Sequence, residues 1–188
     1  MKRFVTVLAA TCALLLQVGA ASAQEYTQGT TYIEPRGGVY GTTNPNVNVV
    51  GTYGGAAGYY LRDGVAVEAE GLGYAVDQKS KKPTALGEST KSETNSAVGV
   101  AGMARWNFVR TSQGTLFVGA GGGGVFADKP LPYNGEKQSG MGQTDLGGSV
   151  ALNKNVSLKA AGRYQHLGSF SDKGLDSLGG NLGLKISF

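Results

Sequence analysis

The chain has 188 residues, of which 32 are glycine, one is cysteine and one is histidine, and its formal net charge at pH 7 is +4. A single cysteine excludes an internal disulfide, and one cysteine with one histidine argues against a transition-metal site. The basic residues are not interleaved with aromatic ones, so the modest positive charge does not indicate nucleic-acid binding. We therefore expect no cofactor, no metal and no nucleic-acid partner.

The first 23 residues have the three parts of a secretory signal peptide. Two basic residues precede an apolar run at 4–16, and Ala21-Ser22-Ala23 is a small-residue cleavage site. The apolar run is too short to cross a membrane as a helix. Cleavage would remove Cys12 and leave a single domain at 24–188 with a formal charge of about +2.

Eight segments of the mature chain alternate between apolar and polar residues, which is the pattern of β-strands with two different faces. Each has about the 9–11 residues that a tilted strand needs to cross a bilayer. The sequence therefore predicts an all-β fold, an eight-stranded antiparallel up-and-down transmembrane β-barrel. The segments are 31–41, 48–61, 65–74, 96–108, 115–127, 140–151, 156–166 and 177–188.

The connections between these segments alternate in length. Short turns in such barrels face the periplasm and long polar loops face outward, which sets the orientation. Asp63-Gly64, in the first short turn, is a strong hairpin signal. The longest connection, 77–95, is rich in Lys, Ser, Thr and Glu and is expected to be a mobile loop. Two alternatives are open for its lysines, namely contact with lipopolysaccharide phosphates or simple solvation; they are Lys79, Lys81, Lys82 and Lys91.

A soluble sandwich would also alternate, but its polar face would meet water. In an eight-stranded barrel the apolar face meets lipid, and the interior has room only for side chains, which disfavours a conducting pore. Buried charges must pair, so the inward set predicts an ionic network that plugs the barrel. Outward aromatic residues near strand ends, namely Tyr59, Trp106, Phe108 and Tyr164, predict interfacial girdles. The inward set is Glu34, Arg36, Glu68, Glu70, Arg105, Asp145, Lys159, Arg163 and Lys185.

The last segment carries the most specific signal. Asn181, Gly183, Ile186 and the terminal Phe188 fill the places of a polar residue, a glycine, an apolar residue and a final aromatic. This arrangement resembles the C-terminal assembly signal of bacterial outer-membrane barrels. The resemblance implies a location in the bacterial outer membrane, contact with outer-membrane lipid and lipopolysaccharide, and recognition of Phe188 by the assembly machinery. We expect a monomer.

The only histidine, His166, falls on the outward, lipid-facing side of its strand near the outer leaflet. Counting back from Phe188 in steps of two places Asp176 on the same face of the neighbouring strand. A carboxylate that orients an imidazole is two-thirds of a hydrolase triad. The pair is therefore a candidate catalytic site.

From residue 105 to the end, the chain resembles the lipid A deacylase (acyloxyacyl-hydrolase-like) barrels through "ARWNFVR", "LFVGAGGGGVFADKPLPYNG" and "RYQHLGSFSDKGLDSLGGNLGLKISF". That family implies removal of an ester-linked acyl chain from lipid A by a His and a Ser in the pattern Arg-Tyr-x-His-x-Ser-Asn-Ala, with a later acid. Arg163, Tyr164 and His166 match the pattern, and Asp176 takes the acid's place. The family's serine is replaced by Gly168, and the Asn-Ala is absent.

Two functions follow, and the sequence leaves both open. The whole mature chain also resembles small non-enzymatic OmpX/OmpA-type barrels, which implies a structural or surface-interaction role with His166 in the aromatic girdle. The alternative is a lipid A ester hydrolase with His166 as base, Asp176 orienting it, and Ser169 or Ser171 as nucleophile. The direction of the Ser169 side chain would distinguish the two.

Overall fold

The computed structural model describes residues 26–84, 87–130, 137–168 and 174–188, with side chains given outside 80–91. The predicted signal peptide, 1–23, lies outside the described residues. Within the described ranges, no helix is long and apolar enough to span a membrane.

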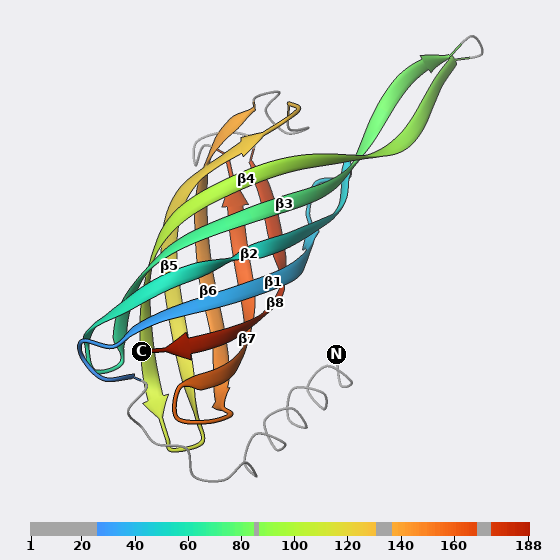
Figure 1. Ribbon diagram of the computed structural model, residues 1–188. Coiled ribbons are helices and arrows are strands. Elements are labelled where there is room, and N and C mark those ends of the chain that lie inside the picture. The colour runs from blue at the N-terminus through green and yellow to red at the C-terminus, as the bar shows by residue number, and fades with distance from the viewer. Residues whose placement is uncertain (1–25, 85–86, 131–136, 169–173) are drawn as a thin grey trace.

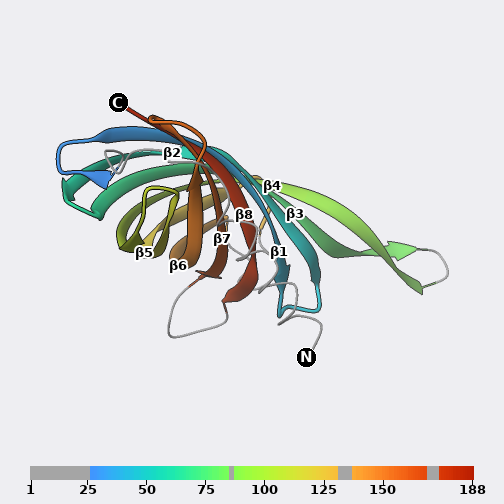
Figure 2. The same ribbon diagram turned by 90° about the horizontal axis from the view of Figure 1, so that it is seen from below.

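Eight antiparallel strands form a closed barrel in which each strand pairs with its neighbours along the chain and β8 pairs back with β1 (Figures 1 and 2). This confirms the predicted fold class and strand count. The strands are β1 (Thr31–Thr42), β2 (Val47–Arg62), β3 (Val65–Thr84), β4 (Gly87–Arg110), β5 (Gly114–Ala127), β6 (Gln138–Ala151), β7 (Val156–Leu167) and β8 (Leu175–Ser187).

The alternation of the sequence becomes the two faces of the wall. Along β7 the odd-numbered residues are buried in the lumen and nearly all of the even-numbered ones are exposed or partly exposed on the outside. The outward residues are uncharged along the part of each strand nearest the turns. Outward ionisable residues occur toward the opposite end, at Asp77 and Lys79 on β3 and at His166 and Asp176 on the last two strands. Closure pairs every strand on both sides, which a barrel in lipid requires because lipid offers no hydrogen bonds.

The two ends of the barrel differ. At the end that we call the turn end, β2 and β3, β4 and β5, and β6 and β7 are joined by short turns, and the turn at Gly64 has φ +77°. Phe188 lies at this end as well, where its backbone N–H donates to the carbonyl of Thr31 over 2.9 Å. The opposite end, which we call the loop end, carries the β3–β4 hairpin and the two longest connections, those between β5 and β6 and between β7 and β8 (Figure 1).

The prediction of a mobile loop at 77–95 is wrong. The β3–β4 ladder continues without a break through the pair Thr84 and Gly87, and the resulting hairpin extends far beyond the rest of the barrel (Figures 1 and 2). The segment has few apolar residues, but an antiparallel ladder satisfies backbone groups whatever the side chains are. At its base, Lys79 Nζ donates to the carbonyl of Pro45 over 3.0 Å.

The interior has layers. The loop end holds an apolar cluster that includes Tyr40, Leu72, Tyr74, Leu167 and Leu175. The middle holds the predicted charged residues, all of which are buried. The turn end holds a second cluster, made of Tyr26, Tyr32, Tyr60 and Ala66. Three layers of side chains thus occupy the lumen from one end to the other.

The glycine run of β5 allows the wall to close around these layers. A Cβ added at Gly123 would lie 1.9 Å from the carbonyl oxygen of Val100, and one added at Gly121 would lie 2.1 Å from that of Gly102. Side chains at these two positions would push β4 and β5 apart. Gly102 is different, because a Cβ added there would meet nothing within 4 Å.

Candidate functional site

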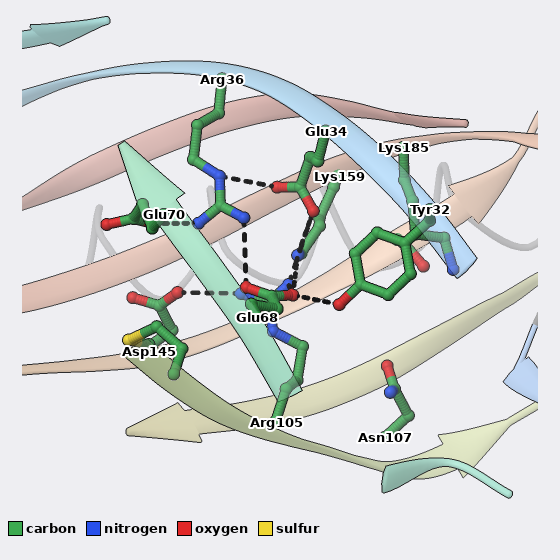
Figure 3. Close-up of polar contacts among 12 residues, drawn as sticks. Tyr32, Glu34, Arg36, Glu68, Glu70, Arg105, Asn107, Asp145, Lys159 and Lys185 are labelled. Atoms are coloured by element: carbon green, nitrogen blue, oxygen red, sulfur yellow. Dashed lines mark hydrogen bonds and ion pairs between the residues drawn. The ribbon is translucent and has the colours of Figure 1, made fainter. Parts of the chain in front are cut away.

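The charged middle of the lumen is built around Arg36 from β1. Its guanidinium lies 3.2 Å from both Glu34 and Glu68, and it also donates to Glu70 (Figure 3). All four side chains are at most 2% exposed. One arginine therefore faces three carboxylates, and the other cations of the lumen must balance them.

Arg105 of β4 and Lys159 of β7 supply part of that balance. Arg105 Nη1 lies 2.9 Å from Glu68 Oε1, and its Nη2 lies 3.3 Å from Asp145 Oδ2. Lys159 Nζ donates to Glu34 Oε2 over 2.6 Å. These contacts connect β1, β3, β4, β6 and β7 across the lumen, as the dashed lines in Figure 3 show.

Arg163 of β7 binds Asp145 and Glu70 at the same time. Its Nε donates to Asp145 Oδ1 over 2.6 Å and its Nη2 to Asp145 Oδ2 over 2.9 Å, which is a bidentate pair. Its Nη1 donates to Glu70 Oε1 over 2.8 Å. The side chain is completely buried.

The network bears out the sequence-based prediction of a salt-bridge-filled interior. Ion pairs connect the inward acids with Arg36, Arg105, Lys159 and Arg163. The ammonium of Lys185 lies over the ring of Tyr26, 3.6 Å from its centroid. In the described part of the chain, no group of three or more His, Cys, Asp or Glu side chains is arranged to hold a metal ion.

The second cluster lies on the outer wall at the loop end. His166 of β7 and Asp176 of β8 stand directly opposite one another in the ladder, and His166 Nδ1 donates to Asp176 Oδ1 over 2.8 Å. Tyr164 Oη donates to the same oxygen over 2.5 Å. The His166 and Asp176 side chains are 16% and 41% exposed. We call these three residues the rim cluster.

The structure brings together two of the three predicted catalytic residues, His166 and Asp176. Tyr164 was expected only as a girdle residue, so its contact with Asp176 was missed. A signal for it existed, because Tyr164 and Asp176 have the same outward parity and are diagonal neighbours on paired strands. Long side chains reach across such diagonals.

The predicted nucleophiles, Ser169 and Ser171, lie outside the described residues. The chain does show where the strand stops before them. Gly168 follows the last residue of β7, has φ +134°, and donates its N–H to the carbonyl of Gly140 over 2.9 Å. This φ favours glycine. The position where the deacylase pattern has serine therefore has a backbone conformation that suits glycine.

The rim cluster has the chemistry of an oriented base. A carboxylate that accepts from Nδ1 fixes the tautomer of the imidazole and leaves Nε2 as the basic nitrogen. Gly174 packs against that side of the ring, and a Cβ added there would lie 2.6 Å from His166 Nε2. Proton transfer by His166, with Asp176 and Tyr164 holding it, is the reaction step that this geometry can support.

Comparison with known proteins places the fold among small outer-membrane barrels. No family model and no curated protein matches the chain. Among solved structures, it is similar to Neisserial surface protein A, with 17% identity, a TM-score of 0.63, and coverage of 86% of this chain and 100% of that one. OprG from Pseudomonas aeruginosa gives 13% identity, a TM-score of 0.61, and coverage of 88% and 98%.

The N-terminal β-barrel domain of Pseudomonas aeruginosa OprF is also similar, with 20% identity, a TM-score of 0.54, and coverage of 86% of this chain and 98% of that domain. These comparisons lend no support to the resemblance to lipid A deacylases. They agree with the ladder in showing one fold: the chain is a closed eight-stranded barrel of the type found in bacterial outer membranes, with a salt-bridge-filled interior.

Proposed function

We propose that the protein is a non-conducting barrel of the bacterial outer membrane with a structural or surface-interaction role. The observation that carries this proposal is the ionic network, because it occupies the lumen at mid-height with paired, buried side chains. An uncharged outer wall matches a hydrocarbon environment. The β3–β4 hairpin, which projects from the loop end, is the element best placed to meet partners outside the cell.

Conductance measurement tests this proposal. Purified protein inserted into planar lipid bilayers should give no discrete conductance steps, while its heat-shifted mobility on gels confirms that it is folded. Regular steps of a defined size would contradict a closed lumen. Density fractionation of cell envelopes tests the location, because the protein should sediment with outer-membrane markers.

The position of the C-terminal residue agrees with the same proposal. The C-terminal Phe188 is 71% exposed at the turn end, where the assembly machinery would recognise it. Outer-membrane lipid and lipopolysaccharide are its proposed surroundings, and we propose a monomeric state. Replacing Phe188 with Ala should lower the amount of folded protein in the outer membrane without changing the amount synthesised.

The rim cluster favours a second candidate, an ester hydrolase that acts on lipid A. The carrying observation is the His166–Asp176 pair at 2.8 Å on the outer wall, where the acyl chains of outer-leaflet lipids would lie. In this proposal His166 is the base, Asp176 orients it, and Ser169 or Ser171 is the nucleophile.

Mass spectrometry of lipid A tests the second candidate. Lipid A from cells that express the protein should lose one acyl chain, and lipid A from cells that express His166→Ala should keep it. Identical lipid A in both strains, with both barrels folded, would reject the hydrolase and leave His166 as part of the girdle.

A further inference from the structure

We propose that Tyr26 is a stopper that closes the periplasmic mouth of the lumen, and that its withdrawal opens a vestibule that attracts small anions. Tyr26 precedes β1, outside the barrel ladder, yet it is only 5% exposed. A large side chain from a segment outside the wall thus lies inside the barrel. Nothing in the proposed structural or enzymatic role requires this.

The position of the ring shows that it spans the mouth. Tyr26 Oη lies 2.8 Å from Ser149 Oγ on β6, which is within hydrogen-bond distance. The ring also makes an edge contact with Tyr60 of β2, with centroids 5.9 Å apart and planes at 83°. Because β2 and β6 are four strands apart in a ring of eight, the side chain bridges opposite walls.

The space beneath the ring is closed while Tyr26 is in place. The residual cavity there has a volume of about 10 Å³, at the lower limit for one water molecule. Removing the phenol would join this cavity to the periplasm. Its lining has three cations, Arg105, Lys159 and Lys185, together with the polar side chains of Asn107 and Ser149.

The vestibule would be electropositive. Among the described side chains that line the cavity, three are cationic and none is a carboxylate. The ammonium of Lys185 lies over the Tyr26 ring, 3.6 Å from its centroid, and its Nζ is 3.5 Å from Tyr60 Oη. Loss of that ring would remove a cation–π contact and turn the ammonium toward entering solvent.

The attachment of Tyr26 suits a part that can leave while the barrel stays folded. Two hydrogen bonds tie its segment to the β2–β3 turn, from Gly64 N–H to the Tyr26 carbonyl over 2.8 Å and from Gln28 N–H to Asp63 Oδ1 over 2.9 Å. Two more join it to β2, from Gly29 N–H to the Tyr60 carbonyl over 2.9 Å and from Tyr60 N–H to the Thr30 carbonyl over 3.0 Å. The bonds of Gly64 and Gln28 lie outside the barrel ladder, whereas those of Tyr60 continue the β1–β2 pairing past Thr31. Such a segment opens at a lower free energy than the whole barrel.

Thiol accessibility tests the stopper, because Cys12 is the only cysteine in the sequence. The full-length gene with Cys12→Ser receives one reporter, Thr115→Cys, whose position is buried and whose hydroxyl lies 2.8 Å from Ser149 Oγ. Outer membranes from a Gram-negative host are treated with an anionic or a cationic methanethiosulfonate. Modification rates are compared with and without Tyr26→Ala.

We expect Tyr26→Ala to accelerate labelling of the reporter by roughly tenfold or more, since a hydrogen bond and a cation–π contact hold the ring. Tyr26→Phe, which keeps the ring, should stay protected. In the opened variant the anionic reagent should react faster than the cationic one. Equal rates with and without Tyr26 would overturn the stopper, and an absent charge preference would overturn the electropositive vestibule.

Controls separate these outcomes from misfolding. Ser112→Cys, at an exposed turn, should react in every background, and Ala101→Cys, in the upper lumen, should remain protected in every background. If Tyr26→Ala lowers the yield of heat-shifted barrel, Asp63→Ala serves instead, because it removes the Gln28 anchor and leaves the ring intact. It should raise the labelling rate by a smaller factor, and an unchanged rate would again overturn the proposal.

Discussion

Charged side chains form two clusters in this barrel, and their surroundings differ. In the lumen, Arg163 contacts Glu70 and Asp145 with no exposure to solvent. At the rim, Asp176 is 41% exposed and accepts from His166 and Tyr164. A buried charge that loses its partner is left uncompensated, whereas an exposed one is solvated. We therefore expect the lumen network to contribute more to the free energy of unfolding than the rim cluster does.

The largest expected effect comes from breaking the lumen network. Arg163→Met leaves Glu70 and Asp145 facing each other without their shared cation, so we expect the free energy of unfolding to fall by about 3–5 kcal/mol. Denaturant titration in phospholipid vesicles measures it. The sole tryptophan, Trp106, reports on the transition because it faces outward and is 57% exposed.

The matched control is Arg62→Met, which removes a cation from the exposed β2–β3 turn. It should change the free energy by less than about 0.5 kcal/mol. Equal losses in Arg163→Met and Arg62→Met would show that total charge, and not the network, sets the stability.

The second largest effect should come from adding a methyl group to a glycine of the barrel wall, and it should depend on which face of the wall the glycine occupies. Gly123→Ala places a methyl group against the Val100 carbonyl, whereas Gly102→Ala places it in open space. We expect the first to lower the free energy of unfolding by about 1–3 kcal/mol and the second to change it by less than about 0.5 kcal/mol. The same titration checks both, and a reversed order would contradict the close approach of β4 and β5.

Gly168→Ser tests whether the backbone conformation at the end of β7 requires glycine. It restores the residue type of the deacylase pattern at a position with φ +134°. The strain should lower the free energy of unfolding by about 1–3 kcal/mol. A variant as stable as the parent would show that the chain tolerates serine here and that the glycine has another cause.

The smallest effect should come from the rim itself. Asp176→Asn weakens the bond from His166 Nδ1 but keeps an acceptor for Tyr164, and solvent replaces part of what is lost. We expect a change of at most about 1 kcal/mol in the free energy of unfolding. A loss as large as that of Arg163→Met would mean that the rim cluster is structural.

The sequence was sufficient to predict the barrel because period-two alternation acts on every strand. Glu34, Lys159 and Arg163 could be placed in the lumen, and His166 and Asp176 outside it, by parity alone. The β3–β4 hairpin was missed because backbone pairing extends it through a polar segment as far as the pair Thr84 and Gly87. A polar segment has no alternation of apolar and polar residues, so the sequence gives no sign of such a ladder.

Tyr26 was missed for a different reason. It lies outside any alternating segment, and its burial depends on Ser149 and Lys185, more than 120 residues away. Likewise, the partners of each lumen charge depend on the tilt of the strands, which the sequence does not state. Parity predicts which face a residue occupies, and the register of the closed barrel determines what it meets.

A double-mutant cycle on Glu70 and Arg163 tests the central claim, that paired charges in the lumen hold the barrel together. The free energy of unfolding is measured for the parent, Glu70→Gln, Arg163→Met and the double variant. We predict that the double variant loses less than the sum of the single losses, by about 1–3 kcal/mol. Strictly additive losses would show that the two side chains do not stabilise each other and would contradict the account.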